Sequence, residues 1–153
     1  MIKKYFLLNA LFVLSVTSYA EPLDPVKLLS SYVGIDTVNP PGNESRAVDF
    51  YAKIFEEEGI EFSSAESAPG RGNIWARIKG GDLPALILLQ HTDVVPATKK
   101  YWDTDPFVAE IKDGYLYGRG VIDMKGAGIS QLVSFIRLHR SGLSLNRDVV
   151  FVA

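Results

Sequence analysis

The segment 86–96 constrains this chain more than any other, because a run of apolar residues ends there in a His and an Asp two positions apart. In a β-strand, residues i and i+2 point to the same face. If the backbone stays extended as far as Asp93, the side chains of His91 and Asp93 lie together where a buried strand reaches the edge of its sheet. An imidazole whose second ring nitrogen is held by a carboxylate is a common metal ligand. A strand followed by a polar turn with an incidental His is the alternative interpretation.

Composition limits the kinds of site that the chain can build. Its 153 residues are the usual size of one domain, and 47% of them are hydrophobic, which is enough to bury a core. The formal net charge of −2 argues against a nucleic-acid partner. The absence of Cys excludes a disulfide framework, a thiolate metal site and a cysteine nucleophile. Because His91 and His139 are the only histidines, any metal site must rely on carboxylates.

Residues 1–20 have the pattern of a secretory signal peptide. Lys3 and Lys4 form a positive start, an apolar stretch follows over 5–16, and a small-x-small cleavage site ends at Ala20. The apolar stretch is shorter than the ~20 residues that a membrane span needs, and a lipid anchor at the cleavage site would require a Cys. The sequence therefore predicts a secreted or periplasmic protein that keeps no stable membrane anchor after cleavage.

Three helices are expected between residues 21 and 153. The first begins after Asp24, which is a typical N-cap residue. The second is expected over about 44–58 with Asn43 as its cap, and the third over about 125–140, because apolar residues recur there at helical spacing. Gly142 supplies the stop signal for the third helix. His139, near the end of this helix, is expected at the surface rather than among metal ligands.

Strands are expected over 60–64, 73–79 and 86–90 and from 148 onward, with a hairpin over 107–117 that turns at Asp113-Gly114. The hairpin is antiparallel, whereas strands joined by helices are expected to be parallel. The predicted fold class is therefore α/β, with a mixed β-sheet flanked by helices. Because the last residues read as a strand without a following turn, we expect the chain to be the N-terminal part of a longer protein.

Asp123 is the second candidate site residue, and it lies between a Gly-rich turn and the start of the third helix. Gly118 and Gly120 in that turn allow a positive φ or a close approach of the backbone to another group. An N-cap of the third helix is the plain alternative role for Asp123. Lys125, two residues later, is interpreted as the surface partner of Asp123.

Two further glycines, Gly126 and Gly128, lie in the first turns of the third helix. Each costs ~1 kcal/mol relative to Ala in a helix, which indicates either a close backbone contact or drift. A dinucleotide-binding loop is excluded, because the sixth positions of the two Gly-x-Gly patterns are Asp123 and Gln131 rather than Gly or Ala.

Taken together, these segments resemble metallopeptidase family twenty. This family includes aminoacylase, acetylornithine deacetylase, succinyl-diaminopimelate desuccinylase and glutamate carboxypeptidase. The segments that carry the resemblance are His91-Thr92-Asp93-Val94-Val95-Pro96, Trp102, Asp105-Pro106-Phe107, the glycine-rich run 113–126 around Asp123, and the loop 37–44. They cover nearly everything after the signal peptide and occur in the order typical of the family.

The resemblance implies a metal site and a partial fold. His91 and Asp123 would bind divalent metal, with Asp123 bridging two ions, and Asp93 would orient His91. The peptide bond after Asp123 is often cis in the family. The two ions would be zinc, with cobalt or manganese as alternatives. Residues 21–153 would form the N-terminal part of a zinc-exopeptidase-like catalytic domain. A general-base Glu, the other ligands and a lid or dimerisation domain would follow Ala153.

The implied activity is metal-dependent hydrolysis of an amide bond in a small peptide or an N-acyl amino acid by the full-length protein. The 153 residues alone are expected to be inactive, because a zinc site normally needs at least three protein ligands. A homodimer could form through the domain that is expected later in the chain. Two alternatives remain open: a secreted, non-catalytic binding domain with the same fold and an incomplete metal site, and an α/β solute-binding domain without metal.

Overall fold

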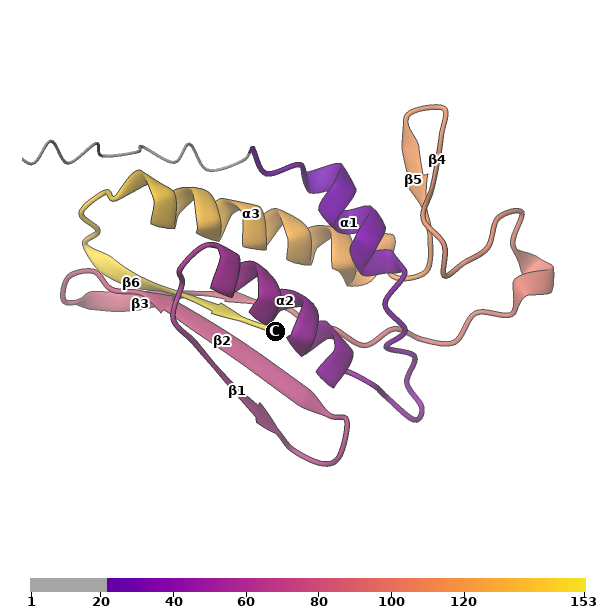
Figure 1. Cartoon of the computed structure of the whole chain (residues 1–153), viewed down its shortest axis with the longest axis horizontal. Helices are drawn as coiled ribbons and strands as arrows, with labels where there is room; N and C mark the ends of the chain where they lie inside the picture. Colours follow the sequence, from indigo (N-terminus) through magenta and orange to yellow (C-terminus); the bar gives the residue numbers. More distant parts are fainter. Residues whose placement is uncertain (1–21) are drawn as a thin grey trace, which may run out of the picture.

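The computed structural model describes residues 22–153, and the predicted signal peptide lies outside them. Within this part the chain forms a four-stranded sheet, three helices and a separate two-stranded hairpin (Figure 1). The helices are α1 (Pro25–Val33), α2 (Ser45–Glu57) and α3 (Gly126–Ser141), with short helical turns η1 (Lys99–Tyr101) and η2 (Val121–Lys125). The strands are β1 (Phe62–Glu66), β2 (Gly72–Ile78), β3 (Leu83–Leu89), β4 (Glu110–Lys112), β5 (Tyr115–Tyr117) and β6 (Arg147–Val152).

The sheet is mixed, which confirms the predicted fold class. Its strand order is β1-β2-β6-β3. Strand β2 is antiparallel to both β1 and β6, whereas β3 is parallel to β6, to which it connects through the hairpin and α3. The hairpin prediction is also confirmed, since β4 and β5 pair antiparallel around a turn in which Asp113 and Gly114 have φ values of 52° and 81°.

The prediction that β3 is a buried strand is wrong for the described residues. Strand β3 pairs only with β6 and forms one edge of the sheet. Ile87 and Leu89 are accordingly 57% and 64% exposed, whereas Leu88 on the opposite face packs against the core. The apolar run indicated a strand correctly, but an apolar run does not report how many neighbours the strand has.

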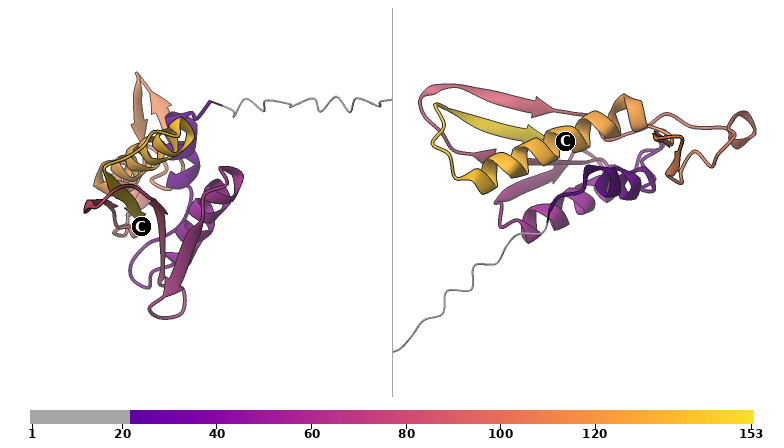
Figure 2. Two further views of the ribbon diagram at one scale, coloured as in Figure 1. Left: turned by 90° about the vertical axis from the view of Figure 1, so that its left-hand side faces the viewer. Right: turned by 90° about the horizontal axis from the view of Figure 1, so that it is seen from above.

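Helices α2 and α3 pack against one face of the sheet, as the views in Figure 2 show. A cluster of buried aromatic rings joins the two helices to β6 through Tyr51, Phe55, Phe135 and Phe151. The residues predicted to face inward from α3 are buried, namely Ile129, Leu132, Val133 and Ile136. The core therefore fixes the direction of α3, and with it the position of the turn η2 that precedes the helix.

The ends of the helices follow the predictions with one exception. Asp24 caps α1 by accepting hydrogen bonds from the amides of Val26 and Lys27, and α3 ends at Gly142 with φ 60°. Asn43, however, does not cap α2 with its side chain. The chain enters α2 through a helical turn at Glu44 (φ −65°), so the backbone carbonyl of Asn43 accepts the amide of Arg46 instead.

Replacing Gly128 by Ala is expected to destabilise the protein by about 1–3 kcal/mol, although Ala favours a helix over Gly. A Cβ at position 128 would overlap the buried amide oxygen of Gln90, which accepts a hydrogen bond from Tyr51 at 3.0 Å. Gly34→Ala is the matched control, because a Cβ there would meet its nearest atom at 3.5 Å, an ordinary contact. Urea unfolding of both variants measures the difference, and a Gly128→Ala protein as stable as the control would contradict this argument.

Candidate metal centre

The structure brings the three predicted site residues together. His91 and Asp93 lie in the segment that follows β3, and Asp123 lies in the turn η2 before α3. The imidazole of His91 joins the two carboxylates: its Nδ1 lies 3.1 Å from Oδ1 of Asp93, and its Nε2 lies 2.8 Å from Oδ1 of Asp123. One ring nitrogen therefore faces each carboxylate, which is the arrangement of a potential ligand pair with an orienting carboxylate behind it.

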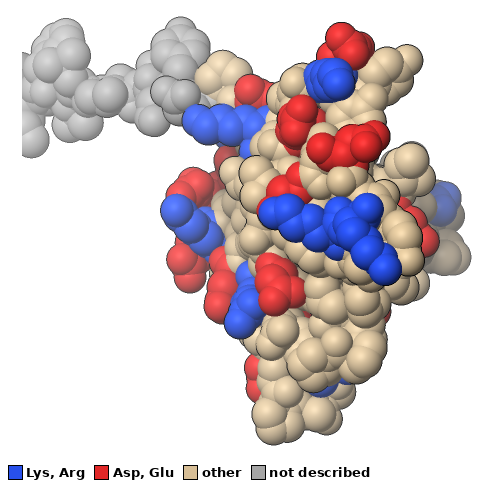
Figure 3. All heavy atoms as spheres, turned by 90° about the vertical axis from the view of Figure 1, so that its right-hand side faces the viewer, with Lys and Arg blue, Asp and Glu red and all other residues tan. Residues whose placement is uncertain are grey.

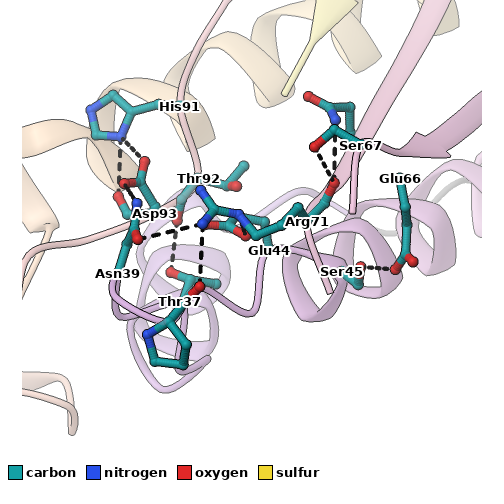
Figure 4. A network of polar contacts seen from close by, with 12 residues as sticks. Thr37, Asn39, Glu44, Ser45, Glu66, Ser67, Arg71, His91, Thr92 and Asp93 are labelled. Atoms are coloured by element: carbon teal, nitrogen blue, oxygen red, sulfur yellow. Dashed lines mark hydrogen bonds and ion pairs between the residues drawn. The ribbon is translucent and has the colours of Figure 1, made fainter. Parts of the chain in front are cut away.

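The position of Asp93 depends on a second loop, residues 36–44, which runs beside it (Figure 4). Val38 and Val94 form a parallel bridge, in which the amide of Val94 donates to Thr37 and the amide of Asn39 donates to Val94. The buried hydroxyl of Thr37 also donates to the carbonyl of Thr92 at 2.7 Å. The backbone on both sides of Asp93 is therefore held by the loop.

The backbone at Asp123 is irregular, and its side chain is 86% exposed. Gly120 adopts the left-handed conformation at φ 82°, and its carbonyl accepts the amide of Lys125 at 2.8 Å. The peptide bond between Asp123 and Met124 is cis, as the family resemblance implied. The alternative role of Asp123 as an N-cap is wrong, because α3 begins at Gly126 after Lys125 and no side chain caps it. The carboxylate of Asp123 instead faces His91.

The interpretation of Lys125 as a surface residue is also wrong. Its side chain is buried, and its ammonium donates to the carbonyls of Tyr32 at 2.9 Å and Ile35 at 2.8 Å. It also lies 4.7 Å from the centre of the Tyr32 ring. Burial lowers the pKa of Lys125 to about 8, against a smaller opposing effect of the Asp36 charge. Lys125 thus ties the end of α1 to the turn that carries Asp123.

The protonation of His91 reflects its two carboxylate neighbours. Burial by itself lowers the pKa of His91, but the hydrogen bonds to the Asp123 carboxylate and to the backbone carbonyl of Asp93, together with the charges of both carboxylates, outweigh it. The pKa of His91 is therefore raised above its ordinary value. A metal ion binds only the neutral imidazole, so protons compete with the metal for this site at mildly acidic pH.

A groove of about 390 Å³ begins at Asp123 and is lined by Trp102, Arg119 and the exposed side of β5. The guanidinium of Arg119 lies 5.1 Å from the centre of the Trp102 ring, so the indole forms one wall of the groove. Trp102 therefore lines the groove. Figure 3 shows this end of the molecule, where basic and acidic side chains lie interspersed.

The donor set fits part of a zinc site. An imidazole and a carboxylate are ordinary zinc ligands, and a second carboxylate on the other ring nitrogen is their usual support. Among residues 22–153, however, no group of three or more His, Cys, Asp or Glu side chains is arranged to hold a metal ion. His139 lies in the last turn of α3 and does not contribute. His91 and Asp123 therefore form an incomplete ligand set within the described residues.

None of the helices in this part of the chain is long and apolar enough to cross a membrane.

Comparison with known proteins matches the segment that carries this site to a peptidase family. Residues 87–153, which include all three site residues, match Peptidase family M20/M25/M40. The chain is similar to this family over that segment. It is 38% identical over 132 residues to succinyl-diaminopimelate desuccinylase of Parvibaculum lavamentivorans, a match that covers 82% of this chain and 32% of the relative. The enzyme of the same name from Wolbachia pipientis wMel is 30% identical over 128 residues, with 83% and 31% covered.

Solved M20 structures share the fold. An M20 family metallo-carboxypeptidase from Sulfolobus solfataricus superposes with a TM-score of 0.70 at 20% identity, over 86% of this chain and 30% of that protein. Human carnosine dipeptidase 1 superposes with a TM-score of 0.58 at 28% identity, over 84% and 31%. The chain thus spans about a third of the length of the M20 relatives that it matches. The Sulfolobus protein is named a metallo-carboxypeptidase.

Sequence reasoning did not single out three residues whose polar contacts lead to Asp93. Figure 4 shows Asn39 beside Asp93, with Arg71 and then Glu44 further along the same network. Only Asn39 and Glu44 fall in a segment that resembles the family. Arg71 follows a turn, and no sequence motif marks it as part of a site. The one signal available was the unusual composition of the loop 37–44, which combines Pro, Gly and Asn with a Glu that proves to be buried.

Proposed function

We propose that this chain supplies part of a two-metal centre in a hydrolase that cleaves an amide bond of an N-acyl amino acid or a small peptide. The arrangement of His91 between Asp93 and Asp123 is the observation that carries the proposal. The match of residues 87–153 to Peptidase family M20/M25/M40 supports it. The full-length protein that we expect would provide the remaining ligands and the general base.

In this proposal His91 and Asp123 hold metal, and Asp93 keeps the imidazole in the state that binds it. When Asp93 accepts a hydrogen bond from Nδ1 of His91, the proton resides on that nitrogen and Nε2 presents a lone pair toward Asp123. Bound divalent zinc would polarise the scissile carbonyl and lower the pKa of a coordinated water. The groove beside Trp102 and Arg119 would receive the part of the substrate next to the amide.

Two substrate classes follow from different observations. The relatives named succinyl-diaminopimelate desuccinylase favour an N-succinyl amino acid. The predicted signal peptide and the similarity to carnosine dipeptidase favour an exported enzyme that acts on short peptides. Both substrates present an amide next to a carboxylate-bearing residue, so one metal centre serves either reaction. We propose a secreted or periplasmic location for the protein.

Removal of metal tests the proposed function. The purified full-length protein should hydrolyse an N-succinyl amino acid or a dipeptide, lose this activity after treatment with a chelator, and recover it when zinc, cobalt or manganese is returned. Hydrolysis that survives complete removal of metal would contradict the metal-dependent mechanism. Zinc binding without any hydrolysis of either substrate class would favour the non-catalytic binding domain instead. The 153-residue chain alone is expected to be inactive in the same assay, because the ligand set found among residues 22–153 is incomplete.

A further inference from the structure

The carboxylate of Asp93 has a second partner that the proposed function does not use. One oxygen, Oδ1, faces Nδ1 of His91 at 3.1 Å, and the other, Oδ2, accepts a hydrogen bond from the side-chain amide of Asn39 at 3.1 Å. Asn39 comes from the loop before α2, 54 residues earlier in the chain. The carboxylate is therefore held at both oxygens, which sets the plane in which it meets the imidazole.

The amide of Asn39 is in turn held by Arg71 (Figure 4). The Nη1 group of Arg71 lies 3.5 Å from Oδ1 of Asn39 and donates to the carbonyl of Pro41 at 3.2 Å. Since Oδ1 faces a guanidinium, the NH₂ group of the amide must face Asp93. This orientation makes Asn39 a donor to the carboxylate rather than a competing acceptor.

Arg71 is fixed by an ion pair with Glu44. The Nε group of Arg71 lies 2.8 Å from Oε2 of Glu44, whose side chain is 8% exposed against 38% for Arg71. The loop packs closely over this pair, because a Cβ at Gly42 (φ 88°) would lie 2.8 Å from both the guanidinium and the Glu44 carboxylate. A half-buried charge pair of this kind stays in one geometry more readily than an exposed one. The polar contacts thus continue from Glu44 through Arg71 and Asn39 to Asp93 and His91.

We propose that Asn39 and Arg71 are positioning residues of the metal centre. Asn39 orients the carboxylate of Asp93, and Arg71, anchored by Glu44, orients the amide of Asn39. In this role both residues act through Asp93 and His91 and not as metal ligands. Their effect reaches the metal through the tautomer and ring orientation of His91. Groups that hydrogen-bond directly to a ligand typically change metal affinity by about 10–100-fold, so Asn39, one contact further away, is expected at the lower end of this range. The proposal rests on the proposed function, because it requires His91 to be a ligand.

The test is a double-mutant cycle on zinc affinity in the full-length protein, measured by competition with a chromophoric chelator. Asn39→Ala is expected to weaken zinc binding by about 10-fold in the wild-type background. It should have no further effect in the Asp93→Ala background, because Asn39 acts only through Asp93. Arg71→Ala should weaken binding less, and Arg71→Lys should restore part of the loss because it keeps the charge.

Two controls are available in the same region. Asn43→Ala removes an Asn of the same loop whose side chain lies outside this chain of contacts, and Arg46→Ala removes an Arg paired with Asp36 on the surface. Both should bind zinc as the wild type does. Asn39→Asp keeps the shape of the side chain but loses the donor to Asp93, so it should bind zinc at least as weakly as Asn39→Ala and keeps the test decisive if the Ala variant does not fold.

The outcomes separate this proposal from the proposed function. If the wild type binds zinc and Asn39→Asp binds it equally well, the positioning role is wrong. It is also wrong if Asn39→Ala weakens zinc binding as much in the Asp93→Ala background as in the wild-type background. If the wild type itself binds no zinc, the proposed function fails first. Selective ¹⁵N labelling of histidine in the metal-free protein provides a second readout, because Asn39→Ala should reduce the fraction of His91 that carries its proton on Nδ1.

Discussion

Replacing His91 by Ala in the full-length protein is expected to reduce metal-dependent amide hydrolysis by roughly 10³-fold or more. The imidazole is the only histidine in the cluster, and its loss leaves Asp123 without the partner that lies 2.8 Å away. Zinc sites normally need at least three protein ligands, so a centre that loses one holds its metal weakly or not at all. Asp123→Ala is expected to have an effect of the same size, because its carboxylate is proposed to bridge both ions.

His139→Ala is the matched control for this prediction. It removes the other histidine of the chain, which is exposed in the last turn of α3 and outside the cluster. The measurements are turnover and bound zinc per protein molecule for the three variants and the wild type. Turnover near the wild-type level in His91→Ala or Asp123→Ala would show that the assignment of ligands is wrong. A similar loss in His139→Ala would show that the assay reports stability rather than metal binding.

Replacing Lys125 by Met is expected to lower the stability of the protein by about 2–4 kcal/mol. The ammonium is the donor to two carbonyls at the end of α1, those of Tyr32 and Ile35, and Met leaves both without it. The thioether fills a similar volume, so the loss reports the hydrogen bonds rather than a cavity. Lys53→Met is the control, because Lys53 is 78% exposed and its contact with Glu57 measures 4.0 Å.

The same variant should change how stability depends on pH. The pKa of Lys125 is about 8 in the folded chain, below its ordinary value of 10.5. Between these values the unfolded chain binds more protons than the folded chain at this residue, so its contribution to stability rises with pH. Burial also raises the pKa of Tyr32 to about 12 and that of Tyr51, which lowers stability once the unfolded tyrosines ionise near pH 10.

Comparison of wild type and Lys125→Met at several pH values isolates this contribution. The difference in the free energy of unfolding should be measured by urea titration between about pH 7.5 and 9.5, below the range in which tyrosines ionise. The stability of the wild type should rise relative to that of Lys125→Met across this window. If the difference in unfolding free energy between wild type and Lys125→Met stays constant across this window, the pKa of Lys125 is not lowered. If Lys125→Met is as stable as the wild type at every pH, the two hydrogen bonds do not hold α1.

The sequence by itself determined much of the local structure and predicted which residues form the site. Periodic apolar residues indicated α3, and Asp113-Gly114 indicated the hairpin turn, because both signals depend on contacts within a few residues. The roles of His91, Asp93 and Asp123 came from a resemblance of motifs. They stay predictions, although the structure brings the three residues together from positions as far as 32 residues apart.

Only the tertiary structure decided what lies around these residues. An apolar run cannot report the number of neighbours of a strand, so β3 was taken as buried although it forms an edge of the described sheet. A lysine next to an aspartate looks like a surface pair, yet Lys125 is buried against carbonyls at least 90 residues away in the chain. The contacts of Asn39 and Arg71 likewise join segments 32 and 54 residues apart. Such contacts depend on how the elements pack, and no local spacing in the sequence encodes them.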